Sequence, residues 1–150
     1  MSCVRLAGLI LAAAACTRGP AQPTAVDTRN DSCANCRMAV SDAHFAAQLA
    51  APGEEPKFFD DLGCLLDYLR KQPHLPRGSV AFLADHRTGE WVRASHAVLT
   101  RIESLETPMA SHLIAHASLA SRDADSASAG GSPVSGEEMF GLAGPPDGKP

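Results

Sequence analysis

The pattern that most constrains the fold is a pair of short apolar runs separated by a turn. The runs cover residues 44–50 and 56–59, and the turn signal Pro52-Gly53 lies between them. Short runs of this kind on either side of a Pro-Gly pair are typical of two antiparallel strands. The segment therefore predicts a β-hairpin.

A helix is expected directly after this hairpin. The side chain of Asp60 or Asp61 can accept a hydrogen bond from the free N–H groups at a helix start. Pro73 then ends the pattern. Apolar residues recur between these limits at spacings of three and four, as on one face of a helix: Leu62, Leu65, Leu66 and Leu69.

Four further apolar segments predict strands. Residues 79–84 and 90–93 flank a polar turn and predict a second hairpin, and residues 97–102 and 112–116 predict two more strands. Hairpins with an interposed helix, without long crossover helices between successive strands, indicate an antiparallel sheet. The expected fold class is α+β, a small antiparallel-sheet domain built from two β-hairpin/helix units.

Composition limits the size of the core and the kind of partner. The chain has 150 residues, a formal net charge of -4 and 5% aromatics, which fits at most one domain with a small core. The mild acidity and the lack of a Lys or Arg run argue against nucleic acid as a partner.

The N-terminal residues have the composition of a secretory signal. Residues 1–15 contain a basic start and about ten apolar residues, which is too short to span a bilayer. The segment Leu11-Ala-Ala-Ala-Ala-Cys16 looks like a bacterial lipobox, so we expect Cys16 to be lipidated. A cleaved secreted protein and a buried N-terminal helix are the alternatives.

The predicted domain lies between two polar segments. Residues 16–32 are expected to be the lipidated cysteine and a flexible tether, and residues 33–142 the folded domain. Residues 121–150 are rich in Gly, Pro and Ser, which by composition alone indicates disorder. Residues 143–150 are expected to be a disordered tail.

Two cysteines follow the tether at a spacing typical of metal or redox sites, in the run Cys33-Ala-Asn-Cys36-Arg-Met38. Arg37 stands where covalent haem attachment would need His, and no matching second Cys or His pair completes a zinc site. A thioredoxin-type dithiol would follow a buried strand, whereas residues 28–32 are polar.

Methionines near these cysteines favour a soft metal ion. Met38 lies two residues after Cys36, and Met109 lies in the Pro108 loop. Thiolates and thioethers together suit Cu(I). A structural disulfide between Cys33 and Cys36 remains an equal alternative, and a methionine is otherwise a core residue.

Three other side chains have ordinary structural roles as their simplest interpretation. Cys64 lies on the predicted helix beside its apolar face and is expected to be a core residue. His112 and His116 would share a face in either a helix or a strand and would then offer a pair of metal ligands, but packed or surface histidines are more common.

In these motifs the chain resembles the NosL family, lipoproteins associated with nitrous oxide reductase maturation. The similarity covers most of the mature chain and is most specific in the Cys36-Arg-Met38 motif and the run Phe59-Asp-Asp-Leu-Gly-Cys64. The family has glycine at the positions of Arg37 and Ala110, a residue that permits positive φ. The resemblance also implies a last helix over residues 121–131 and a terminal segment over 137–142.

The resemblance implies a monomeric Cu(I) chaperone with no catalytic activity, tethered by lipid to the periplasmic face of a bacterial outer membrane. It would deliver copper to nitrous oxide reductase, its assembly machinery or a related copper enzyme. Carried over to this sequence, the metal ligands are Cys36, Met38 and Met109, with Cys33 as a further thiol. A thiol–disulfide redox protein using Cys33 and Cys36, and a structural lipoprotein, are the other hypotheses.

Overall fold

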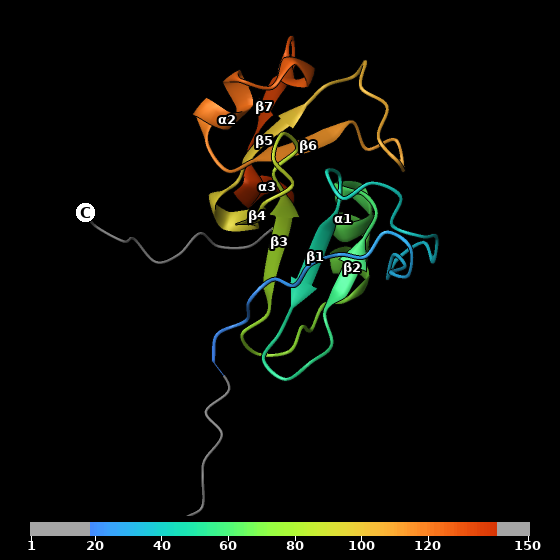
Figure 1. Ribbon diagram of the computed structural model, residues 1–150. Helices are drawn as coiled ribbons and strands as arrows, with labels where there is room; N and C mark the ends of the chain where they lie inside the picture. The colour runs from blue at the N-terminus through green and yellow to red at the C-terminus, as the bar shows by residue number, and fades with distance from the viewer. Residues whose placement is uncertain (1–18, 141–150) are drawn as a thin grey trace, which may run out of the picture.

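The computed structural model describes residues 19–140, which form two antiparallel sheets with helices packed around them (Figure 1). In chain order the elements are β1 (Ala47–Ala50), β2 (Lys57–Phe59), α1 (Leu62–Lys71), β3 (Val80–Ala84), β4 (Trp91–Arg93), the 3-10 helix η1 (Ala94–His96), β5 (Val98–Arg101), β6 (Leu113–His116), α2 (Leu119–Asp123), the 3-10 helix η2 (Ser126–Ser128), β7 (Ser132–Val134) and α3 (Gly136–Phe140).

The two sheets repeat one topology. The strand order is β2-β1-β3-β4 in the larger sheet and β6-β5-β7 in the smaller one. In each, a hairpin is followed by a helix, and the next strand returns antiparallel to the first strand of the hairpin. The expected α+β class and its two β-hairpin/helix units are confirmed.

The first unit follows the sequence pattern closely. Ala47 pairs with Phe59 in the first hairpin, and Asp61 begins α1 by accepting a hydrogen bond from Gly63 N–H at 2.6 Å. Leu62, Leu65 and Leu66 are buried on the face of α1 that covers the sheet. Each fully buried leucine contributes about 1.5–3 kcal/mol relative to an exposed one.

The second unit includes a strand that the sequence did not predict. Ser118 caps α2 by accepting a hydrogen bond from Ser121 N–H at 3.1 Å. After η2 the chain forms β7, which pairs with β5 at the edge of the smaller sheet. Residues 119–140 therefore carry regular elements where composition alone indicated disorder. The helix that the resemblance implied over residues 121–131 is wrong, because α2 ends at Asp123 and is followed by the short η2.

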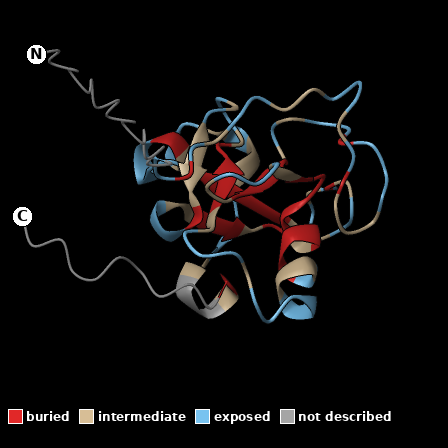
Figure 2. Cartoon of the chain, turned by 90° about the horizontal axis from the view of Figure 1, so that it is seen from below, coloured by how far each residue is buried: buried red, intermediate tan, exposed pale blue. Residues whose placement is uncertain are grey.

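The main hydrophobic core joins the two units. It contains residues of both sheets and of α1, and buried segments gather in the middle of the molecule (Figure 2). The sheets meet at the end of β3, where His86 N–H donates a 2.8 Å hydrogen bond to Ala115 O. The core members with the largest buried side chains are Phe59, Leu62, Leu65, Leu83 and Leu99.

Part of the expected tether is instead packed on the outer face of the larger sheet. The side chain of Gln48 accepts a 3.0 Å hydrogen bond from Thr24 N–H and donates a 2.9 Å hydrogen bond to Thr24 O. Ala21 packs beside Ala50 and Phe82. The folded unit thus begins before Cys33, because the side-chain amide of Gln48 pairs with the backbone of this segment as a neighbouring strand would.

Residues 1–18 and 141–150, with the predicted signal, Cys16 and the final tail, lie outside the described part. Within residues 19–140, every helix is too short or too polar to cross a membrane.

Candidate metal centre

The turn after Ser32 brings Cys33 and Cys36 together. Cys33 N–H donates to Met38 O at 2.8 Å, and Arg37 N–H donates to Cys33 O at 3.0 Å, so the segment forms a closed turn. Ala34 N–H donates to Phe58 O at 2.8 Å, which fixes the turn to strand β2. The turn is therefore held by the sheet rather than free in solvent.

Helix α1 supplies a third thiol that sequence reasoning treated only as core. Cys64 is buried on this helix, and its Sγ lies with those of Cys33 and Cys36 within 4.8 Å of one another. All three thiols are free. Cys33 is 0% exposed, Cys64 is 3% exposed and Cys36 is half-buried. This group, the sulfur cluster, can hold a metal ion.

Two thiols of the cluster, those of Cys33 and Cys64, have pKa values shifted in opposite directions. Burial acts to raise the pKa of Cys33, but hydrogen bonds from the backbone at Cys36, Asp60 and Asn35 outweigh it and lower the pKa. Burial raises the pKa of Cys64, and the neighbouring sulfur of Cys33 raises it further. The pKa of Cys33 is thus lowered and that of Cys64 raised, and a metal ion that binds the cluster can displace the proton of a thiol.

The Pro108 loop lies against the start of α1. Oδ2 of Asp61, whose other oxygen caps the helix, accepts hydrogen bonds from Thr107 Oγ1 at 2.6 Å and Met109 N–H at 3.1 Å. Gly63 permits this approach, because a Cβ there would lie 2.9 Å from Ser111 Cβ. Met109 is thereby fixed over the end of α1 that carries Cys64.

Met109 and Cys64 line one cavity of about 340 Å³. Arg70 and Arg101 line it as well. Asp67, which also lines the cavity, forms an ion pair with Arg70 at 3.1 Å, so the positive charge that favours an anionic thiolate complex is that of Arg101. Met109 is 40% exposed and Met38, at the end of the cysteine turn, is 58% exposed. Both thioethers therefore lie at the surface, in contrast to the buried sulfurs of Cys33 and Cys64.

Three residues in these loops have backbone conformations that favour glycine, one of them His112 with φ 59°. Arg37 has φ 69° and Ala110 has φ 55°, both in the left-handed region. These are the two positions at which the resembling family has glycine. Arg37 and Ala110 thus adopt left-handed φ values that glycine adopts freely, and their backbones are strained as a result.

His112 and His116 do not form the pair of metal ligands that the sequence left open as the less common alternative. The ring of His112 interacts with Leu105 O at 2.8 Å, whereas that of His116 interacts with Asp125. Four residues of extended chain span about 13 Å, too far for one ion to join both rings. His116 belongs instead to a second cluster, with His86 and Asp125.

The fold and the cluster define a class: a small α+β domain with a partly buried three-cysteine group able to hold a metal ion. No protein-family model matches the chain, and comparisons with curated proteins and with solved structures find no match.

Proposed function

We propose that this protein is a Cu(I) chaperone that binds one ion at the sulfur cluster and performs no catalysis. One observation carries the proposal: three free thiols lie within 4.8 Å of one another, and Cys64 shares a cavity with Met109. Sulfur donors of both kinds at one site are typical of Cu(I) binding.

The donor set suits Cu(I) better than Zn(II). Cu(I) accepts two or three sulfur ligands, including the thioether of a methionine, whereas structural zinc sites have four thiolate or imidazole ligands. Cys33 and Cys36 would supply two thiolates, and either Met109 or Cys64 would complete a three-coordinate site. Met38 follows the turn closely enough to take part when a partner docks.

The exposure of the thioethers supports a role in transfer. A carrier must hold its ion yet allow the ligands of a recipient to reach it. Met38 and Met109 lie at the surface, and Met109 lines the cavity beside Cys64. A recipient's ligand can therefore replace a thioether first, while the buried thiolates still hold the ion.

The recipient and the location follow from the resemblance. We propose nitrous oxide reductase, its assembly machinery or a related copper enzyme as the partner, and a monomer tethered through lipidated Cys16 to the periplasmic face of a bacterial membrane. Radiolabelled palmitate incorporation into the wild-type precursor but not into a Cys16→Ser variant would support the anchor. A soluble, unlabelled wild type would contradict it.

Anaerobic competition titration of the reduced protein against a Cu(I) chelator tests copper binding. We expect one ion per chain, with affinity lost in the Cys33→Ser/Cys36→Ser double variant. Met109→Leu should weaken binding, because it removes the sulfur but keeps the size, and Met139→Leu in α3 is the matched control. Equal affinities of wild type and the double-serine variant would contradict the proposal.

A thiol–disulfide redox protein is the alternative, and the lowered pKa of Cys33 favours it. Burial opposes this lowering, but backbone hydrogen bonds around Cys33 dominate. The two functions differ in their dependence on Met109. Met109→Leu leaves a Cys33–Cys36 redox potential unchanged but weakens Cu(I) binding, so measuring both in one variant separates them.

A further inference from the structure

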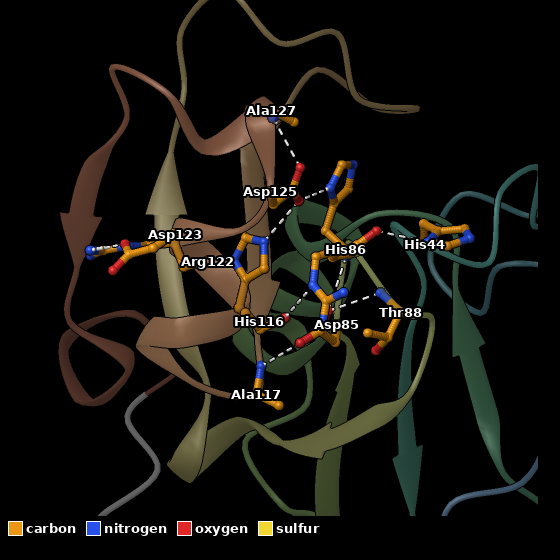
Figure 3. Close-up of polar contacts among 12 residues, drawn as sticks. His44, Asp85, His86, Thr88, His116, Ala117, Arg122, Asp123, Asp125 and Ala127 are labelled. Atoms are coloured by element: carbon orange, nitrogen blue, oxygen red, sulfur yellow. Dashed lines mark hydrogen bonds and ion pairs between the residues drawn. The ribbon is translucent and has the colours of Figure 1, made fainter.

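A second cluster of metal-ligating side chains lies in the other half of the fold. Oδ2 of Asp125 accepts hydrogen bonds from His86 Nδ1 at 2.6 Å and His116 Nε2 at 2.9 Å (Figure 3). His86 lies in the turn after β3, His116 ends β6, and Asp125 caps η2. Three segments far apart in the chain thus place these side chains together.

The cluster is nearly closed to solvent. The side chains of His86, His116 and Asp125 are 15%, 0% and 9% exposed. The pKa of Asp125 is about 2: burial acts to raise it, but hydrogen bonds from His116, His86 and Ala127 N–H lower it more. Buried ionisable groups of this kind are usually paired or bind metal ions.

The topological repeat makes His116 unusual. Phe59 ends β2 two residues before the cap of α1, and His116 ends β6 two residues before the cap of α2. Both are 0% exposed. The same place in the fold therefore holds an apolar ring in one unit and a metal-ligating ring in the other. An apolar ring can be buried there without a polar partner, so packing alone does not require a histidine at this position.

Unpartnered polar atoms surround the cluster. His116 Nδ1, Thr100 Oγ1 and Ser128 Oγ are buried without a hydrogen-bond partner among the described residues. Thr100 and Ser128 line a cavity of about 360 Å³ together with Asp125. Such atoms are rare in native folds, and an ion or a water network at the site is a recognised explanation.

We propose that His86, His116 and Asp125 bind a divalent transition-metal ion of the borderline class. Two imidazole nitrogens and one carboxylate suit such ions, and the donor set differs from the soft sulfur cluster. Each neutral imidazole coordinates by moving its proton to the other ring nitrogen. For His116 this places the proton on Nδ1. The Thr100 hydroxyl, on the same face of the β5–β6 ladder, can accept from it through a water molecule.

The geometry needs only a small adjustment. Metal–ligand bonds of about 2.1 Å in a tetrahedral site separate the ligand atoms by roughly 3.3 Å. The three ligand atoms already lie within 4.8 Å of one another. Withdrawal of the Asp125 carboxylate by side-chain rotation, with approach of the two ring nitrogens to this separation, makes room for the ion, with water as the fourth ligand.

Titration of the reduced full chain with Co(II) tests this site. We expect one equivalent at His86, His116 and Asp125 to give visible d–d bands without thiolate-to-cobalt charge transfer. His86→Ala and Asp125→Asn should weaken that binding by more than about 100-fold, since loss of an outer partner alone typically weakens binding 10–100-fold. His96→Ala, which removes an exposed histidine elsewhere, should leave it unchanged.

Two results would overturn the proposal. One is a Co(II) spectrum that is the same in wild type and His86→Ala, and the other is binding only through charge-transfer bands that disappear in the Cys33→Ser/Cys36→Ser variant. Either would make the Asp125 cluster a structural clamp. Because His86 lies outside the sulfur cluster, His86→Ala should keep its Cu(I) affinity, so failure here is distinguishable from failure of the copper function.

Discussion

The backbone N–H of Met109 donates a hydrogen bond to Oδ2 of Asp61 at 3.1 Å. A single carboxylate therefore begins helix α1 and fixes the loop that carries a candidate copper ligand. The helix bearing Cys64 and the loop bearing Met109 are coupled through this one side chain, which is 1% exposed.

Asp61→Ala should affect both stability and copper binding. The variant loses the helix cap and leaves the buried Thr107 hydroxyl without its acceptor, so we expect a loss of about 2–4 kcal/mol in the free energy of unfolding. Urea denaturation measures it, and Cu(I) affinity should fall in parallel. Asp67→Ala removes only an exposed ion pair with Arg70 and should change stability by less than about 0.5 kcal/mol. Equal effects of the two substitutions would refute this role of Asp61.

Ala110→Gly should stabilise the protein. Ala110 has φ 55°, a conformation that costs a non-glycine residue about 1–2 kcal/mol. Glycine removes this strain, but its greater conformational freedom in the unfolded chain costs about 0.5–1 kcal/mol of stability. We expect a net gain of up to about 1 kcal/mol in thermal or urea unfolding. Ala120→Gly, in helix α2, is the control and should destabilise by about 0.5–1 kcal/mol. A loss of stability in Ala110→Gly would contradict the strained loop geometry.

Cys64→Ser should weaken Cu(I) binding while preserving the fold. Serine has nearly the same shape but replaces a soft sulfur with a hard oxygen, so we expect a fall in affinity of about 10-fold or more. The competition titration that measures wild type also measures this variant, and circular dichroism checks its folding. Unchanged affinity in a folded variant would show that Met109 alone supplies the third ligand.

Stability in acid should depend on Asp125. Hydrogen bonds from His116 and His86 overcome the opposing effect of burial and lower its pKa from 3.8 to about 2. A lowered folded-state pKa adds stability above the unfolded value, which is lost as the pH falls from about 4 towards 2. Over that window wild type should lose about 2 kcal/mol more than Asp125→Asn. Asp123→Asn, an exposed neighbour, should follow wild type; identical curves for all three proteins would contradict the prediction.

The local elements were predictable because their signals are local. The Pro52-Gly53 turn, the Asp61 cap and the leucine spacing of α1 each depend on residues close in the chain. Strand β7 was missed because Pro133 and the preceding glycines indicate a chain breaker. Proline is tolerated there because β7 is an edge strand.

The site was only partly predictable because its assembly is long-range. The sequence identified Cys33 and Cys36 from their spacing, but the role of Cys64 depends on the hydrogen bond from Ala34 to Phe58 that brings the turn to α1. The contact of His116 with Asp125 was not predicted, since it joins the end of β6 to the cap of η2 through side chains nine residues apart. Hydrogen bonds to carbonyl and carboxylate groups in distant parts of the chain produce no recognisable residue spacing in the sequence.

The two hydrogen bonds between the Gln48 side chain and the Thr24 backbone limit how far an anchored domain could move. Only four residues separate Cys16 from Ala21, where packing on the sheet begins, and these five residue steps of extended chain span at most about 17 Å. A freely jointed segment reaching to Cys33 would allow about three times that distance. On the proposed lipidation of Cys16, the domain would stay close to the bilayer surface, and the proposed recipient would have to come to it there.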